Sequence, residues 1–169
     1  YRDALAREGI PVYALRGEGF YETREVLDLV LALQAVRDPR DDRALLGFLR
    51  SPFVGLRDDS LAAIALDHPS PYFLRLADVA LADAAEQQRL ERARRWLEDW
   101  DALRDRAPIT TLLRRIMDDT GWLAHLALLG EPKPQAIANV RQFLSMVRAM
   151  GDVGMDDLRH AIDERRARE

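Results

Sequence analysis

Residues 22–37 read ETREVLDLVLALQAVR, and this stretch decides the fold class of the chain. Its apolar side chains recur at steps of three and four residues, at Val26, Leu29, Val30, Leu33 and Val36. This spacing places them on one face of a helix, so the stretch predicts an amphipathic α-helix with one buried side. The break follows at residues 38–42, DPRDD, where the proline disfavours helical backbone at the residue before it.

Helical spacing continues through most of the chain beyond this first helix. Asp41 is a candidate N-cap for the next helix, and Asp58 or Asp59 for the one after it. Residues 83–105 form the longest continuous pattern, about six helical turns, and residues 132–150 form another. We therefore expect a mostly α-helical, multi-helix fold.

The N-terminal segment departs from this pattern. Residues 10–15, IPVYAL, are short and rich in β-forming side chains, and RGEG follows them at 16–19. A lone strand cannot satisfy its backbone hydrogen bonds, so it must pair with strands that this chain does not contain. We expect residues 1–20 to be the stub of a β-containing domain and residues 21–169 to be a helical domain. A start at Tyr1, without a signal peptide, fits a piece of a longer protein.

Composition excludes several functional classes. The chain has 169 residues, no cysteine and a net charge of −4, from 25 Lys+Arg and 29 Asp+Glu. Without cysteine it can hold no disulfide scaffold, thiol nucleophile, zinc finger or iron–sulfur centre. No apolar run is long enough to span a bilayer, so the cytoplasm is the default compartment. The charge excludes a protein that is basic throughout but permits a local patch for nucleic acid.

Catalytic motifs are missing from the sequence. It contains no G-x-x-x-x-G-K-[ST] phosphate loop and no G-x-S-x-G nucleophile motif. Asp156, His160 and Glu164 share one helix face and would suit a metal hydrolase. Arginines interleave with them, so a solvated helix face explains them better. We expect no catalytic and no metal-binding residues.

The loop SPFVGLR at residues 51–57 has the best chemistry for binding. It joins two predicted helices and carries Gly55. The second helix offers free backbone N–H groups at its start, and these can hold a phosphate without reading a base. Arg50 and Arg57 would add positive charge, whereas Asp58 and Asp59 would oppose an anion unless they point away.

Trp96 and Trp100, one helical turn apart, allow two interpretations. Aromatic rings can stack on bases of single-stranded nucleic acid. Packing in the core of a long amphipathic helix is the favoured interpretation.

Several segments in order resemble a known family. They are GIPVY at 9–13, GEGFYE at 17–22, EVLDL at 25–29, DPRDD at 38–42 and LRSPFVGL at 49–56. In order and spacing they resemble UvrD/Rep/PcrA-type superfamily-one DNA helicases. The later part, including TGWL at 120–123, looks more like the AddA/RecB branch of helicase–nucleases.

The resemblance implies the helical 2B insertion of an ATP-driven DNA helicase acting in repair and recombination. The stub at residues 1–20 would then belong to the second RecA-like domain. ATP and Mg²⁺ are expected for the full-length parent, whose nucleotide-binding residues lie outside this segment. The segment alone should bind no cofactor and hydrolyse no ATP. Implied partners are DNA at a duplex or junction, the missing RecA-like domains, and a nuclease or partner subunit, with no membrane.

The resemblance also implies site residues. Gly17, Gly19 and Phe20 match a segment near the single strand, and Ser51, Gly55 and Leu56 match a loop that touches duplex backbone. Arg50 and Arg57 complete the candidate DNA-binding set. Two departures stand out: Glu18 replaces a glycine, and Arg57 replaces the last glycine of the loop motif.

Two functions therefore follow from the sequence. The first is an accessory domain that contacts or gates duplex DNA through a helix-hairpin-helix-like loop. The alternative is a helical protein-interaction or autoinhibitory module without DNA contact. Capture of a partner that depends on the helices at 83–105 or 132–150 would favour the alternative.

Overall fold

The computed structural model describes residues 20–67, 69–122, 124, 134–151 and 153–166. Their elements are η1 (Phe20–Glu22), α2 (Arg24–Arg37), α3 (Asp42–Arg50), α4 (Asp58–Asp67), η2 (Tyr72–Arg75), α5 (Ala84–Arg104), α6 (Ile109–Thr120), α8 (Pro134–Ala149) and α9 (Met155–Arg166). The predicted mostly α-helical fold is confirmed. The predicted strand at 10–15, and with it Gly17 and Gly19, lies outside the described residues.

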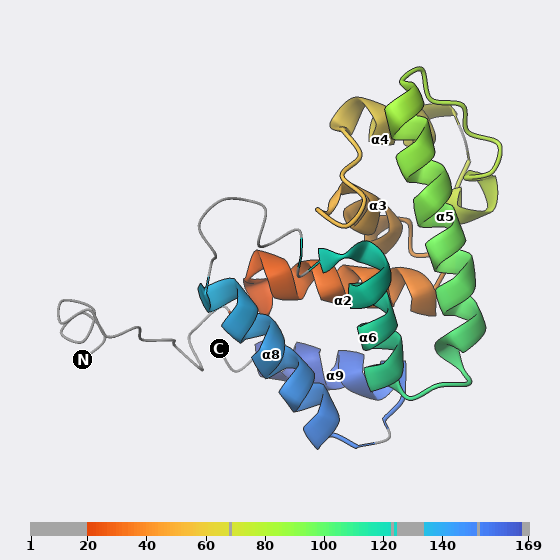
Figure 1. The fold of residues 1–169 in the computed structure, drawn as a ribbon. Coiled ribbons are helices and arrows are strands. Elements are labelled where there is room, and N and C mark those ends of the chain that lie inside the picture. Colours follow the sequence, from red (N-terminus) through yellow and green to blue (C-terminus); the bar gives the residue numbers. More distant parts are fainter. Residues whose placement is uncertain (1–19, 68, 123, 125–133, 152, 167–169) are drawn as a thin grey trace, which may run out of the picture.

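Helix α2 lies at the centre of the molecule. It packs against α3, α5, α6 and α8, so its neighbours come from both halves of the chain (Figure 1). The apolar stripe predicted from residues 22–37 is buried along its whole length, at Val26, Leu29, Val30, Leu33 and Val36. Ala32 and Ala35 are buried too, which explains why more than one face of this helix carries small or apolar side chains.

The predicted break between α2 and α3 is stabilised by its aspartates. The Asp38 carboxylate accepts the Arg40 N–H at 3.0 Å, which closes the turn. Asp41 accepts the Ala44 N–H at 2.9 Å, which confirms it as the N-cap of α3. Asp42 accepts the Tyr72 N–H at 2.8 Å and so ties the start of α3 to η2.

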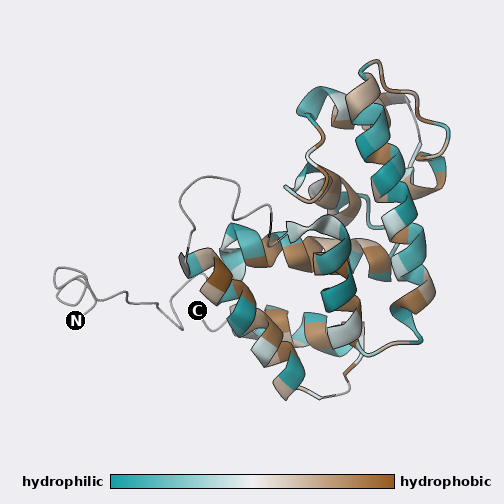
Figure 2. Ribbon diagram, in the orientation of Figure 1, coloured by the Kyte–Doolittle hydropathy of each residue, from teal (hydrophilic) through white to brown (hydrophobic). Residues whose placement is uncertain are grey.

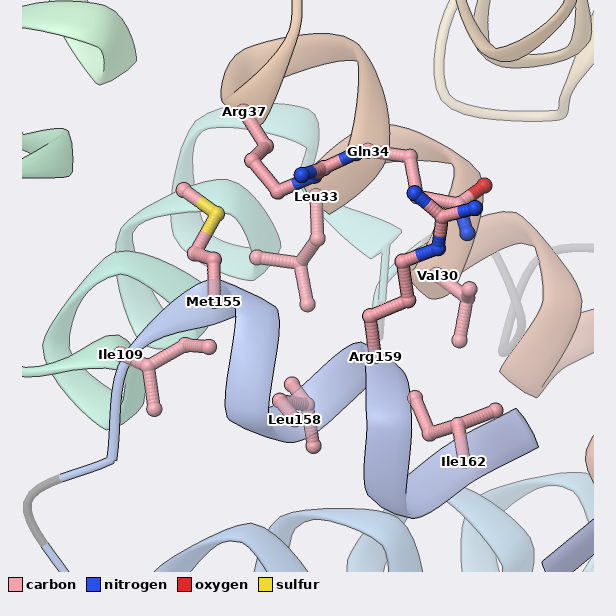
Figure 3. Close-up of a pocket in the computed structure, with 9 residues that line it drawn as sticks. All are labelled: Val30, Leu33, Gln34, Arg37, Ile109, Met155, Leu158, Arg159 and Ile162. Atoms are coloured by element: carbon pink, nitrogen blue, oxygen red, sulfur yellow. The ribbon is translucent and has the colours of Figure 1, made fainter. Parts of the chain in front are cut away.

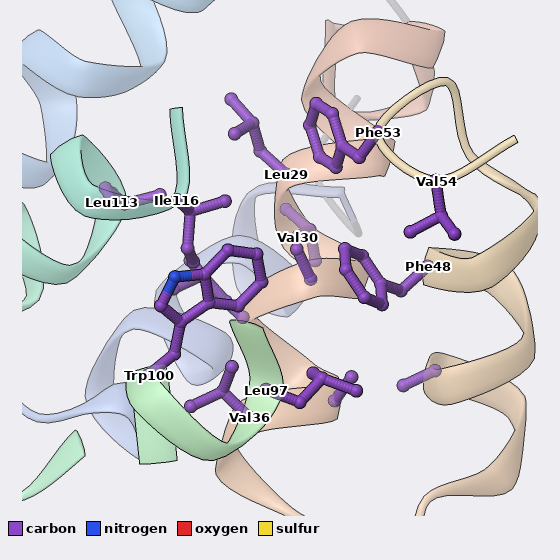
Figure 4. Packing of buried hydrophobic residues seen from close by; sticks show 14 of the residues in the cluster. Leu29, Val30, Val36, Phe48, Phe53, Val54, Leu97, Trp100, Leu113 and Ile116 are labelled. Atoms are coloured by element: carbon purple, nitrogen blue, oxygen red, sulfur yellow. The ribbon is translucent and has the colours of Figure 1, made fainter. Parts of the chain in front are cut away.

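Aromatic side chains fill the core between α2, α3 and α5. Trp100 is fully buried, meets Phe48 edge-on at 5.6 Å, and donates its indole N–H to Asp119 at 2.8 Å (Figure 4). Apolar residues line the inner sides of the helices, while polar residues cover the outer surface of α5 (Figure 2). The favoured interpretation of Trp100 as a core residue is therefore confirmed.

Three predicted boundaries or elements differ from the structure. Side-chain spacing predicts a short apolar helix at residues 72–80, but only Tyr72–Arg75 form a 3₁₀ turn. Pro108 precedes α6 instead of being its first residue. Asp58 is the first residue of α4 and not its cap, because the first helical hydrogen bond runs from Leu61 to the Arg57 carbonyl at 3.1 Å.

The C-terminal helix α9 closes the lower side of the molecule. Leu158 and Ile162 are buried against α2, and a cavity of about 20 Å³ remains between α2, α6 and α9 (Figure 3). This space holds about one water molecule. Within the part of the chain that the structure describes, no helix is both long and apolar enough to cross a membrane.

Candidate functional site

The candidate site is the loop at residues 51–57 that joins α3 to α4. Ser51 organises its first half: the Ser51 hydroxyl donates to the Phe48 carbonyl at 2.7 Å, and the Ser51 carbonyl accepts the N–H groups of Val54 and Gly55. The Leu56 N–H returns to the Leu49 carbonyl at 3.0 Å. The loop therefore folds back on the end of α3 as a tight hairpin.

Gly55 sits at the turn of this hairpin. Its φ of +72° belongs to the left-handed region, which other residues adopt at a cost. A Cβ placed there would meet no atom within 4 Å. The glycine is thus required by backbone conformation and not by lack of space.

Apolar side chains anchor the loop to the core. Phe53, Val54 and Leu56 are each only 4% exposed. Figure 4 shows Phe53 and Val54 directed from the loop toward the core side of Phe48. Two predicted DNA-binding residues, Leu56 and Ser51, are thus buried and contribute through the shape of the loop, whereas Arg50 and Arg57 are exposed.

A buried carboxylate from α5 caps the start of α4. Glu86 is 2% exposed and accepts the Arg57 backbone N–H at 2.9 Å. It also accepts a hydrogen bond from the Ser60 hydroxyl and one from Arg89 at 2.9 Å. The Arg57 N–H contributes most to holding the pKa of the Glu86 carboxyl below its usual value. Glu86 therefore takes the place of the missing side-chain cap.

Asp83 completes this arrangement from the N-cap position of α5. One of its oxygens accepts the N–H groups of Ala85 and Glu86, at 2.8 and 3.2 Å. The other accepts the Arg57 guanidinium at 2.8 Å. The N–H donors of the helix, Glu86 first, lower the pKa of the Asp83 carboxyl, so Asp83 is anionic at neutral pH. Below, Asp83 and Glu86 together are called the acidic pair.

The acidic pair holds the loop by its backbone as well as by Arg57. Arg89, which pairs with Glu86, also donates to the Gly55 carbonyl at 3.0 Å. The N-termini of α4 and α5 meet here, and each carries a partial positive charge of about half a unit. Two carboxylates therefore face two guanidinium groups and two helix N-termini.

The second candidate arginine is paired within the loop region as well. Arg50, in the last turn of α3, forms a two-pronged contact with Asp58, at 2.9 and 3.1 Å. Both side chains are exposed, so this pair contributes little to stability and can exchange partners.

The first turn of α4 retains backbone donors. The N–H groups of Asp58, Asp59 and Ser60 have no carbonyl four residues before them within the helix, and no partner for them lies among the described residues. Asp58 and Asp59 are exposed. The loop's own N–H groups are used internally, so Asp58 and Asp59 offer the donors that an anion can reach.

Phe20, the one described residue of the predicted single-strand segment, is buried. It is 8% exposed and meets Tyr21 edge-on at 5.0 Å. Its role near single-stranded DNA stays a prediction, as do those of Gly17 and Gly19 outside the described residues.

Trp96 has neighbours on both sides along α5. It stacks on Trp100 one turn later, at 6.0 Å and 10°, and the Arg92 guanidinium lies 5.2 Å from its ring centre one turn earlier. Because its two faces are covered from opposite directions along the helix, a base has no free face on which to stack.

The alternative metal site gains no support from the structure. Asp156 pairs with Arg37, and His160 pairs with Glu164 at 3.1 Å. Among the described residues, no group of three His, Asp or Glu side chains could hold a metal ion.

The acidic pair was not predicted from the sequence, although a signal for it exists. Asp83 followed by Glu86 is the spacing of a capping box, in which the glutamate bonds to the N–H of its own N-cap residue. Glu86 instead bonds to the N–H of Arg57, the residue before α4. Spacing alone predicts a cap but not the helix that receives it.

Comparison with known proteins gives the relatives of the chain. No protein-family model matches it. It is 35% identical over 122 residues to the AddA subunit of the ATP-dependent helicase/nuclease of Pelotomaculum thermopropionicum, a match that covers 71% of this chain and 10% of that protein. The protein of the same name from Listeria innocua is 30% identical over 143 residues, with 82% and 11% covered. That from Bacillus velezensis is 28% identical over 151 residues, with 87% and 12% covered.

The chain thus spans about a tenth of the length of the curated relatives it matches. The similarity covers most of the chain in each case and agrees with the resemblance of its motifs. The chain is homologous to a segment of AddA, the helicase-bearing polypeptide of the ATP-dependent helicase/nuclease, and so belongs to the UvrD/Rep/PcrA-type superfamily-one helicase family.

Proposed function

We propose that this chain is a 2B-type accessory domain of an ATP-dependent DNA helicase and that its α3–α4 loop contacts the backbone of duplex DNA. The observation that carries the proposal is the first turn of α4, where exposed N–H donors at Asp58 and Asp59 lie between Arg50 and Arg57. A helix N-terminus with nearby arginines binds phosphate without reading sequence.

Asp58 and Asp59 limit the strength of this contact. Their carboxylates lie at the same helix end, and Asp58 already pairs with Arg50. We therefore expect weak, salt-sensitive binding, suited to a domain that steers DNA for a motor elsewhere in the protein. A full-length helicase would supply the ATP and Mg²⁺ chemistry, because this sequence has no phosphate loop.

A salt series of binding to fork-shaped DNA tests the proposal. We expect the wild-type chain to bind at low salt without sequence preference. The double variant Arg50→Gln/Arg57→Gln should bind more weakly, with a slope of log K against log [salt] that is smaller by about one to two. Absence of binding by the wild type, or an unchanged slope in the double variant, would contradict the proposal.

The same domain is expected to work beside the RecA-like domains of its helicase and a nuclease or partner subunit, in the cytoplasm. The alternative, a protein-interaction or autoinhibitory module, has one observation in its favour. Leu66 and Leu74 are 83% and 69% exposed, which is unusual for large apolar side chains. Loss of partner binding in a Leu66→Ser/Leu74→Ser variant with unchanged DNA binding would favour it.

A further inference from the structure

Both arginines of the candidate site are engaged by carboxylates. Arg57 is held from the neighbouring helix: its Nη2 lies 2.8 Å from Asp83 Oδ2, and its Nε lies 3.8 Å from the buried Glu86. The Arg57 side chain is 62% exposed and that of Asp83 is 42% exposed. An ion pair with this much exposure is weak and can exchange for another anion.

Asp83 performs two tasks with two different oxygen atoms. Oδ1 caps α5 through the N–H groups of Ala85 and Glu86, while Oδ2 accepts Arg57. Asparagine caps a helix about as well as aspartate, because its carbonyl oxygen accepts the same N–H groups. Replacing Asp83 by asparagine therefore keeps the cap and removes the charge that holds Arg57.

We propose that Asp83 masks Arg57 from DNA: its carboxylate occupies the guanidinium that would otherwise pair with a backbone phosphate, and so lowers the affinity of the loop. This inference rests on the proposed DNA contact. Carboxylate and phosphate compete for a guanidinium through the same charge-assisted hydrogen bonds. Glu86 acts differently, because its main bond is to the Arg57 backbone, so it holds the loop in place whichever anion Arg57 meets.

A double-mutant cycle on DNA binding tests the masking. Wild type, Asp83→Asn, Arg57→Gln and the double variant would be titrated with a fluorescein-labelled fork DNA, with anisotropy read at several salt concentrations. We expect Asp83→Asn to tighten binding by about two- to fivefold, the range of an exposed ion pair. Its salt slope should steepen by about one, for one further phosphate contact. Both effects should vanish in the Arg57→Gln background.

Asp59→Asn provides the matched control. It removes one negative charge beside the same loop, and no ion pair of Asp59 is found among the described residues. Its effect on affinity should therefore be the same with and without Arg57. Circular dichroism would check that each variant is helical, and Asp83→Ser, which also caps a helix, would replace Asp83→Asn if that variant fails to fold.

The outcomes separate the masking from the DNA contact itself. If Asp83→Asn tightens binding equally in both Arg57 backgrounds, it acts by charge alone and the masking is overturned. If Arg57→Gln weakens binding while Asp83→Asn changes nothing, the masking fails and the DNA contact stands. If neither the wild type nor Asp83→Asn binds the fork, the proposed contact fails, and the masking with it.

Discussion

Replacing Glu86 by alanine should destabilise the domain far more than the same change elsewhere on α5. Glu86 is buried and accepts the Arg57 N–H, the Ser60 hydroxyl and Arg89. The first two donors are enclosed, and each lost hydrogen bond costs about 1 kcal/mol. Arg89 and the Arg57 guanidinium are partly exposed and regain water, so they add little. We therefore expect a loss of about 2 kcal/mol.

Thermal unfolding followed by circular dichroism at 222 nm would measure this loss. For a domain of this size, 2 kcal/mol corresponds to a fall in Tm of about 4–8 °C. Glu98→Ala is the matched control on the same helix, because Glu98 is half exposed and pairs only with Arg94 one turn away. Its cost should stay below about 0.5 kcal/mol. Equal Tm values for the two variants would refute the capping role of Glu86.

Three further results are expected. Burial raises the pKa of Asp28 to about 6; its protonated form therefore favours folding, and this contribution is lost as the pH rises through 6, so Asp28→Asn should gain about 1–2 kcal/mol over wild type at pH 8 and nothing at pH 4 in urea titrations. Gly55→Ala should cost about 1 kcal/mol by urea unfolding, because of the positive φ, and Gly55→Asn less. Trp96→Ala should bind fork DNA as wild type does in anisotropy titrations, since both faces of the ring are covered; a several-fold loss would revive base stacking.

The helices were predictable from the sequence because their signals are local. The apolar stripe from Val26 to Val36 and the cap at Asp41 follow from side-chain spacing and short-range hydrogen bonds, and the structure confirms both. The helix expected at 72–80 failed because the Tyr72 N–H is taken by Asp42, 30 residues away. No short-range pattern contains that contact.

The candidate site was predictable only in part for the same reason. The loop, its glycine and its two arginines stand together in the sequence at residues 50–57. Their partners Asp83 and Glu86 lie about 30 residues later, and only tertiary packing brings them to the loop. The burial of Ser51 and Leu56 likewise depends on the core against which the loop folds.

Backbone amide NMR of the chain during titration with a short DNA duplex is the most direct measurement of the DNA contact. The proposed contact predicts that the largest shifts occur at the N–H groups of Asp58 and Asp59 and at the Arg57 side-chain Nε–H, and that they diminish as salt is added. Shifts confined to the surface around Leu66 and Leu74, or no shifts at low salt, would contradict it.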